Sequence, residues 1–198
     1  MKLVGTYLSP YARRVAAALI SRGLTFEHEP VNGYQQFEIA SRYNPVAKVP
    51  SLVLDDGEVL IDSTAILDYL NELTPAEPLI PKESKARRAT LKLASIGYGV
   101  YEQAANLGFR GRDVPESEAD RWKAQIIGGL RALDEAAREG GPLRATPLDA
   151  AAITAIVGVE YLARRVPDLE VASVAPTLAQ LATEYYDAPP FALTRSAR

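Results

Sequence analysis

The chain of 198 residues contains no cysteine and a single histidine. The first absence excludes disulfide bonds, thiolate metal sites and a cysteine nucleophile, so any sulfur chemistry must come from a ligand. The second leaves only His28 for a Ser-His-Asp triad and excludes sites that need several histidines, so we expect no bound metal. Because a glutamate stands on either side of it, His28 is interpreted as a solvated strand residue.

Several other features are missing. There is no run of about 18 apolar residues, and the N-terminal MKLVGTYLSP lacks the apolar core of a secretion signal, so we expect a cytoplasmic protein that does not enter a membrane. No G-x-G-x-x-G, P-loop or H-E-x-x-H motif supports a dinucleotide, nucleotide or zinc-hydrolase site. With 22 basic and 25 acidic residues the net charge is -3, so no overall basic charge indicates a nucleic-acid partner. The expected partners are small molecules or a second copy of the chain.

The first part of the chain alternates strand and helix signals. Apolar residues over Lys2–Tyr7 and Leu24–Val31 predict strands, and helical spacing over Pro10–Arg22 predicts a helix between them that ends at Gly23. Together these segments form a βαβ unit.

A second group of strands follows an irregular region. A short helix is expected at Tyr34–Arg42, and the stretch up to Pro50 contains too much proline for a regular element. Strands at Ser51–Leu54 and Glu58–Ile61 then flank a turn, and Asp62-Ser63 begins a helix with an apolar stripe. The order is therefore βαβ, loop, ββα.

Beyond a segment with three prolines, Thr74–Pro81, only helix signals remain. Helical spacing is clearest over residues 93–107, 122–133, 150–162 and 174–186. The run Thr146-Pro147-Leu148-Asp149 matches a capping box, with Thr146 as the N-cap of the third of these helices. We therefore expect an α/β domain over residues 1–74, a linker over 75–84 and an all-helical domain over 85–198.

Three short segments could carry chemistry, although each also has an ordinary structural explanation. Ser9-Pro10 places a hydroxyl at a helix N-cap, where the hydroxyl and the helix dipole would stabilise a thiolate. At Val49-Pro50 a trans proline that starts a strand is favoured on position alone, whereas a cis bond would expose the Val49 backbone to an extended peptide. Asp62-Ser63, at another helix start, could hold the zwitterionic head of an amino acid or could simply be a cap.

Taken together, the motifs S-P-Y-A-R-R, N-P-V-A-K-V-P and D-S-T-A-I-L-D-Y-L resemble those of the glutathione transferases in order and approximate spacing. The resemblance is to serine-type members, both tau-like and bacterial. It implies a thioredoxin-like N-terminal domain, a helical C-terminal domain, a homodimer, and glutathione as co-substrate. The implied activity is conjugation of glutathione to a hydrophobic electrophile, or reduction of a peroxide. A non-catalytic glutathione-binding or protein-interaction protein of the same fold is the alternative.

The resemblance also implies roles for individual residues. Ser9 takes the place of the residue that activates the thiol, with Tyr7 as a less favoured rival. No cysteine follows Ser9 in the first helix, which argues against mixed-disulfide chemistry. The implied glutathione-binding residues are Lys48, Val49, Pro50 in the cis form, Asp62 and Ser63.

The electrophile pocket would be lined from the first long helix after the linker. Its aromatic residues Tyr98, Tyr101 and Phe109 are the candidates, and packing in the core is the favoured alternative for each.

Overall fold

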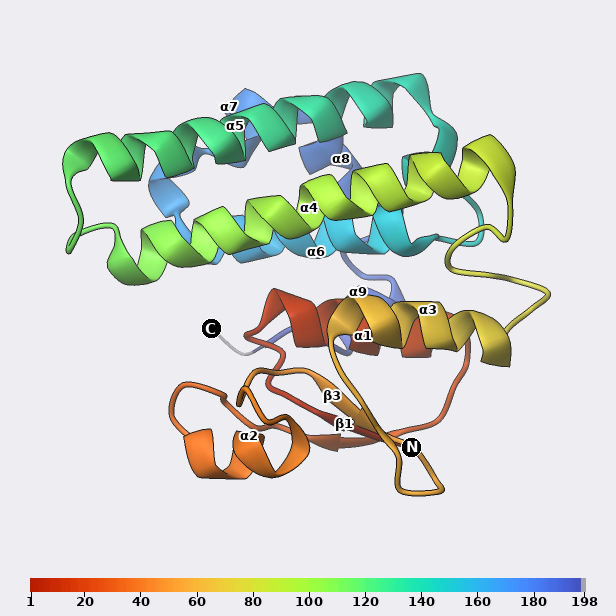
Figure 1. Cartoon of the computed structure of the whole chain (residues 1–198). Helices are drawn as coiled ribbons and strands as arrows, with labels where there is room; N and C mark the ends of the chain where they lie inside the picture. The colour runs from red at the N-terminus through yellow and green to blue at the C-terminus, as the bar shows by residue number, and fades with distance from the viewer. Residues whose placement is uncertain (197–198) are drawn as a thin grey trace. The chain divides into compact units, whose positions relative to one another are not determined.

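The computed structural model describes residues 1–196, which form two compact units. The N-terminal unit comprises Met1–Ile80 together with residues 187–196, and the helical unit comprises Pro81–Tyr186. Figure 1 labels the elements. Those of the N-terminal unit are β1 (Lys2–Val4), α1 (Pro10–Ser21), β2 (Glu27–Glu29), α2 (Phe37–Tyr43), β3 (Ser51–Val53), β4 (Val59–Leu60), α3 (Ser63–Leu73) and α9 (Pro189–Ala192).

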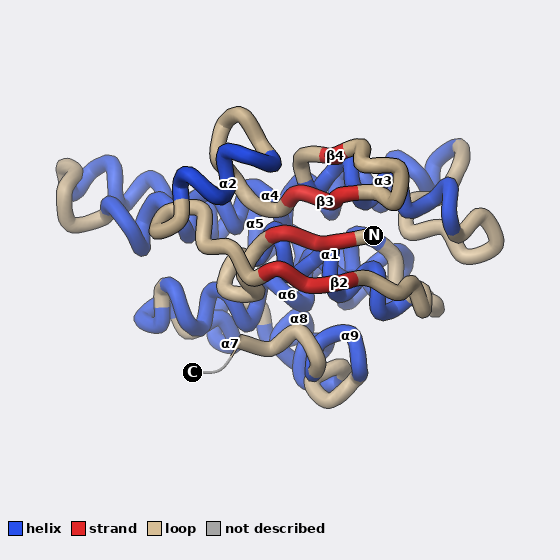
Figure 2. The backbone as a smooth tube through the Cα atoms, turned by 90° about the horizontal axis from the view of Figure 1, so that it is seen from below, coloured by secondary structure: helices blue, strands red, loops and turns tan. Residues whose placement is uncertain are grey.

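The N-terminal unit is built on a mixed sheet with the strand order β2-β1-β3-β4, which Figure 2 shows face on. Strand β1 pairs in parallel with β2 and antiparallel with β3, and β4 is antiparallel to β3. Leu3 stands opposite Leu52 in this register, and both are fully buried. The predicted βαβ-ββα order is confirmed, with strands shorter than expected.

Helices cover both faces of this sheet (Figure 1). On one face α1 and α3 lie side by side and bury Val15, Leu19 and Ile66. On the other face α2 packs through Ala40 against Val4. Alternating side chains of the short strands therefore enter two separate apolar layers.

A polar cluster joins the end of α2 to the sheet. Lys2 Nζ lies 2.8 Å from a Glu29 carboxylate oxygen and 3.0 Å from the hydroxyl oxygen of Tyr43, and that hydroxyl donates to Glu29 over 2.9 Å. The hydrogen bond from Lys2, followed by that from Tyr43, lowers the pKa of Glu29 below its ordinary value. The hydrogen bond with Glu29 raises the pKa of Lys2.

The last described residues belong with the N-terminal unit rather than with the helices that precede them. Helix α9 packs on α1, and Phe191 is fully buried. The buried Arg13 donates to the Phe191 carbonyl oxygen over 3.2 Å and to Thr194 Oγ1 over 3.3 Å. The helical domain expected over 85–198 is therefore shorter, because this segment buries its apolar side chain on α1.

The helical unit has no strand among its described residues. Its elements are α4 (Ser84–Arg110), α5 (Glu116–Glu139), η1 (Gly141–Arg144), α6 (Ala150–Arg165), η2 (Pro167–Leu169), α7 (Val171–Val174) and α8 (Pro176–Glu184). Helix α6 is buried along most of its length and packs on α4, as its uniformly apolar sequence predicts. The helix expected over 174–186 is present as α8, with slightly shorter bounds. A separate short helix, α7, precedes it, and Pro176 cannot donate the hydrogen bond that would continue α7.

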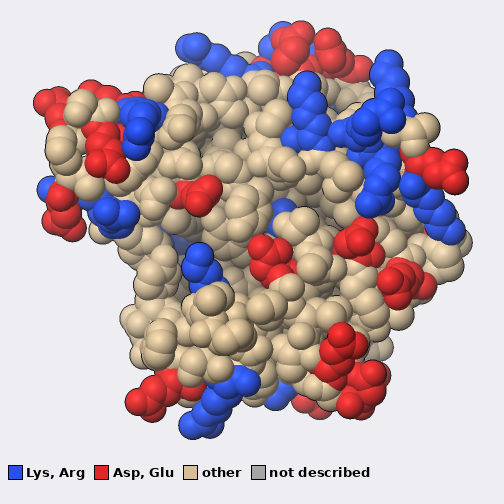
Figure 3. Space-filling view, in the orientation of Figure 1, with Lys and Arg blue, Asp and Glu red and all other residues tan. Residues whose placement is uncertain are grey.

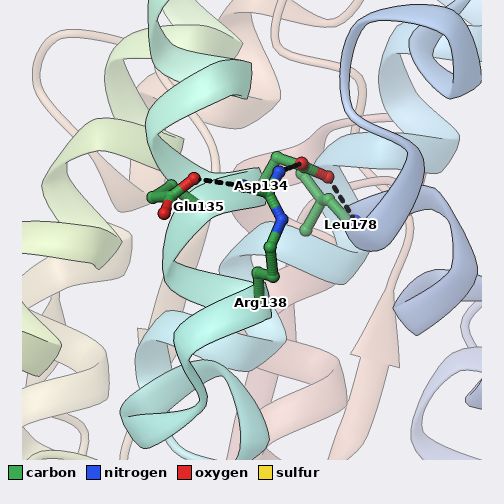
Figure 4. A network of polar contacts seen from close by, with 4 residues as sticks. All are labelled: Asp134, Glu135, Arg138 and Leu178. Carbon is green, nitrogen blue, oxygen red and sulfur yellow. Dashed lines mark hydrogen bonds and ion pairs between the residues drawn. The ribbon is translucent and has the colours of Figure 1, made fainter.

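Within the helical unit, the carboxylate of Asp134 in α5 caps the first turn of the neighbouring helix α8 (Figure 4). Its carboxylate accepts a hydrogen bond of 2.9 Å from the backbone N–H of Leu178 and forms an ion pair of 2.7 Å with Arg138. Asp134 is buried, whereas Glu135, which also pairs with Arg138, is exposed. A buried carboxylate at a helix start satisfies a backbone donor that would otherwise lack a partner.

The N-cap of α6 differs from the prediction. Asp149, not Thr146, occupies that position and accepts a hydrogen bond of 2.9 Å from the Ala152 N–H. Its second carboxylate oxygen accepts a bond of 2.7 Å from the Thr90 hydroxyl. The expected capping box was therefore wrong: the helix begins three residues later, where one buried carboxylate both caps α6 and bonds α4.

No helix within residues 1–196 is long and apolar enough to cross a membrane. Basic and acidic side chains are mixed on the face shown in Figure 3, with basic side chains gathered where α4 begins. The exposed residues Lys85, Arg88 and Lys92 lie in that part of α4.

Candidate functional site

The N-terminal ends of α1 and α3 and the segment before β3 converge on the end of β1. Gly5 follows β1 with φ of +144°, a conformation that favours glycine. A Cβ built there would lie 2.9 Å from the Ala12 Cβ and 3.1 Å from the Val49 Cβ. This close approach places the first turn of α1 directly against the Val49-Pro50 segment, so two of the predicted site segments are brought together.

Ser9 is the N-cap of α1, with Pro10 at the first helical position. Its Oγ accepts a hydrogen bond from the Ala12 N–H at 3.4 Å, and the side chain is partly exposed. A hydroxyl that accepts this bond keeps its own hydrogen for a ligand. The geometry allows Ser9 to donate to an anion at the positive end of the helix.

The Val49–Pro50 peptide bond is cis, as the resemblance implied. Buried Asn44 fixes the turn over residues 44–48 that leads into this bond. Its Nδ2 donates to the Lys48 carbonyl oxygen over 2.9 Å, and its Oδ1 accepts a hydrogen bond from the Val46 N–H over 3.1 Å. The Lys48 side chain is exposed.

At the start of α3, Asp62 is the N-cap, and its Oδ1 accepts the Thr64 N–H over 2.8 Å. The Ile61–Asp62 peptide bond is cis. Ser63, the first helical residue, is buried, whereas the Asp62 side chain is exposed. This helix start can therefore offer a carboxylate for an ammonium group and a hydroxyl for a carboxylate.

Arg14 links the two helix starts, a role that the sequence did not reveal. It is buried in α1, and its guanidinium donates to Ser63 Oγ from Nη2 at 2.8 Å and from Nε at 3.1 Å. Nη2 also lies 2.8 Å from the Thr64 hydroxyl oxygen. The only signal was the occurrence of two consecutive arginines in an otherwise apolar helix.

The Tyr7 side chain lies on the β2 side of β1, opposite to β3. Its ring stacks on His28 of β2, with centroids 3.9 Å apart. In the sheet, β2 and β3 flank β1 from opposite sides, so this contact holds the Tyr7 ring toward β2 and away from the strand that follows Pro50. Burial raises the pKa of the Tyr7 hydroxyl. His28 itself is exposed, and its Nε2 lies 2.8 Å from the Gly5 carbonyl oxygen.

The aromatic residues considered for an electrophile pocket differ in how deeply they are buried. Tyr101 is fully buried, its hydroxyl donates to the Thr154 carbonyl, and its ring makes an edge contact with Tyr161. Tyr101 is therefore a core residue, which is the alternative that its sequence pattern favoured, and its candidate place in an open pocket is wrong. Tyr98 is partly exposed and stays a prediction, whereas Phe109 is 46% exposed and lies under the Arg165 guanidinium.

Among residues 1–196, no group of three or more histidine or acidic side chains could hold a metal ion. The donors at the converging helix starts are hydroxyl, carboxylate and backbone groups, which suit a zwitterionic peptide better than a cofactor.

Comparisons with known proteins point to the glutathione transferases. The family model "Glutathione S-transferase, N-terminal domain" matches residues 3–78. A Pseudomonas fluorescens glutathione transferase family member, solved with bound glutathione, is 29% identical, has a TM-score of 0.88, and is matched over 100% of this chain and 99% of its own. The same protein with bound S-(propanoic acid)-glutathione is 30% identical, with a TM-score of 0.83 and coverages of 100% and 97%.

Two curated relatives widen the comparison. The uncharacterized GST-like protein YibF of Escherichia coli is 28% identical over 82% of both chains. A maleylacetoacetate isomerase of Pseudomonas aeruginosa is 32% identical over 68% of both. The matched segment covers only 63% to 64% of plant glutathione S-transferases from wheat and Arabidopsis thaliana.

Proposed function

Because this chain belongs to the glutathione S-transferase family, we propose that it binds glutathione in its N-terminal unit and activates the thiol through Ser9. The activated thiolate would attack an electrophilic carbon or a peroxide. The observation that carries the proposal is the packing around Gly5, which puts the hydroxyl-capped start of α1 against the cis-Pro50 segment.

The tripeptide would be held by three groups of contacts. Asp62 and Ser63 at the start of α3 would bind the ammonium and carboxylate of the γ-glutamyl head. The Val49 backbone would pair with the cysteinyl unit as an added strand, and Lys48 would pair with the glycyl carboxylate. Support for glutathione as the ligand comes from the glutathione bound in the similar Pseudomonas fluorescens structure.

Catalysis would come from proximity and from a lowered thiol pKa. An ordinary thiol has a pKa of about 8.5, and lowering it by about two units requires roughly 2.7 kcal/mol of preference for the thiolate. A hydrogen bond from the Ser9 hydroxyl to a charged group supplies about 1.5 to 3 kcal/mol, and the dipole of α1 adds about 0.3 to 1 kcal/mol. The two contributions together are of the required size.

The test compares the unsubstituted protein with Ser9→Ala in glutathione binding and in conjugation of a panel of electrophiles and hydroperoxides. We expect Ser9→Ala to keep most of its glutathione affinity and to lose most of its turnover, about 10- to 100-fold. Ser21→Ala is the matched control, since Ser21 lies at the far end of α1 and donates to the Ala18 carbonyl. Tyr7→Phe tests the rival residue. Full activity in Ser9→Ala would remove Ser9 from its role.

Two outcomes of the panel identify other functions. Because a maleylacetoacetate isomerase is among the relatives, the panel includes maleylacetoacetate, whose isomerisation without net loss of glutathione would assign that reaction instead. Glutathione binding without turnover of any compound would favour a non-catalytic binding protein. We further propose a homodimer, which sedimentation at several concentrations tests directly.

A further inference from the structure

We propose that Arg14 is a positioning residue that makes the Ser63 hydroxyl an obligate hydrogen-bond donor, so that the start of α3 selects a carboxylate. The inference rests on the proposed function, because the carboxylate in question is that of the γ-glutamyl head of glutathione. It adds a residue that acts through Ser63 and need not touch the ligand.

The geometry of the Ser63 hydroxyl carries the inference. Its oxygen accepts from both Nη2 and Nε of Arg14, at 2.8 and 3.1 Å. A hydroxyl has two acceptor lone pairs and one hydrogen, so two donated bonds fill its acceptor capacity. The remaining hydrogen can only be donated. A ligand carboxylate matches such a group, whereas an ammonium or amide N–H would meet a hydroxyl that has no lone pair left to accept it.

The shape and burial of Arg14 make this arrangement rigid. Its exposed fraction is 2%, and its planar guanidinium also donates to Thr64 Oγ1 at 2.8 Å. An arginine fork can contact two neighbouring hydroxyls in fixed directions, which a lysine ammonium on a flexible stem cannot do. Its positive charge also lies near the N-terminus of α3, where it adds to the attraction of the helix dipole for an anion.

The preceding residue offers a matched control in the same turn of α1. Arg13 is equally buried, and it donates to the Phe191 carbonyl oxygen and to Thr194 Oγ1 of the C-terminal segment. A substitution there perturbs a buried arginine without touching Ser63. Arg13→Lys should therefore lower the melting temperature without changing the affinity for glutathione.

The decisive experiment is a double-mutant cycle with Arg14→Lys, Ser63→Ala and the double variant, with the glutathione Kd measured by calorimetry. We expect Arg14→Lys alone to raise the Kd about tenfold, equivalent to about 1.4 kcal/mol. In the Ser63→Ala background the same substitution should change the Kd by less than about twofold, because the group through which it acts is gone. The turnover number at saturating glutathione should stay unchanged in Arg14→Lys, since the thiolate is held at Ser9.

A ligand comparison on the unsubstituted protein does not depend on any variant folding. Glutathione amidated at the γ-glutamyl α-carboxylate should bind at least about tenfold more weakly than glutathione itself. Equal binding of the two ligands, additive effects in the cycle, or the same rise in Kd for Arg13→Lys would each overturn the role of Arg14. If the unsubstituted protein does not bind glutathione at all, the proposed function fails and this inference fails with it. Binding with an additive cycle refutes the inference alone.

Discussion

Gly5 is the residue at which a single methyl group should disturb both the stability of the N-terminal unit and the proposed glutathione site. In Gly5→Ala the new Cβ would meet the Ala12 and Val49 Cβ atoms at 2.9 and 3.1 Å. Both contacts are made by atoms fixed to the backbone, so no side chain can rotate out of the way. The φ of +144° adds a conformational cost for any residue with a Cβ.

The expected loss of stability follows from these two contributions. Overpacking in a close-packed region costs about 1 to 3 kcal/mol, and a non-glycine residue in a sparsely populated φ region costs about 1 to 3 kcal/mol. We therefore expect Gly5→Ala to lower the free energy of unfolding by about 2 to 6 kcal/mol. Urea denaturation measures this change, and calorimetry should show weaker glutathione binding, because relief of the clash moves Val49 away from α1.

Gly23→Ala separates strain from overpacking. Gly23 also has a positive φ, of +65°, but a Cβ there would meet nothing within 4 Å. Gly23→Ala should therefore lower the free energy of unfolding only by the conformational cost of a positive φ, and it should leave glutathione binding unchanged. Close packing at Gly5 would play no part in stability or binding if Gly5→Ala were no less stable than Gly23→Ala and bound glutathione as well as the unsubstituted protein.

Three further predictions concern single side chains. In the urea denaturation assay, Asp149→Ala should lower the free energy of unfolding by about 1 to 3 kcal/mol, and Thr146→Ala should lower it by less than about 0.5 kcal/mol. A larger loss in Thr146→Ala than in Asp149→Ala would instead support the predicted capping box. Asp134→Ala should cost about 1 to 3 kcal/mol, whereas Glu135→Ala, which removes only an exposed ion pair, should be nearly neutral by thermal melting. The pKa of Glu29 is lowered in the folded state, so its contribution is present above its ordinary value of 4.5 and is lost as the pH falls through the folded value. Glu29→Gln should therefore reduce the loss of stability between about pH 6 and about pH 3.5, an effect of at most about 1 kcal/mol because the side chain is partly exposed.

The parts of the site that the sequence predicted are those set by local chemistry. Ser9 with Pro10, and Asp62 at the next helix start, satisfy backbone donors within three residues of themselves, so the pattern is visible in a short stretch of sequence. The Val49-Pro50 segment was ambiguous from position alone, and only its order relative to the other motifs indicated the cis form that the structure contains.

The parts that the sequence did not reveal depend on contacts distant along the chain. Arg14 bonds a hydroxyl 49 positions away, and Arg13 bonds a residue 181 positions away, yet the two look alike in the sequence. Helix α9 is only four residues long, too short for a periodic signal, and its position depends on packing against α1. Tyr101 has the helical spacing of a pocket residue as much as that of a core residue, and only its neighbours distinguish the two.

The absence of cysteine turns the proposed mechanism into a direct spectroscopic measurement. Because the chain has no thiol of its own, any thiolate absorbance that appears when glutathione binds comes from the ligand. Titrating that absorbance with pH, after subtraction of the ligand-free protein and its ten tyrosines, therefore reports the pKa of the bound thiol. A value well below the ordinary 8.5 or so that returns toward it in Ser9→Ala, but not in Arg14→Lys, would assign thiol activation to the start of α1 and head-group recognition to the start of α3. Equal shifts in both variants would mean that the two helix starts do not act separately.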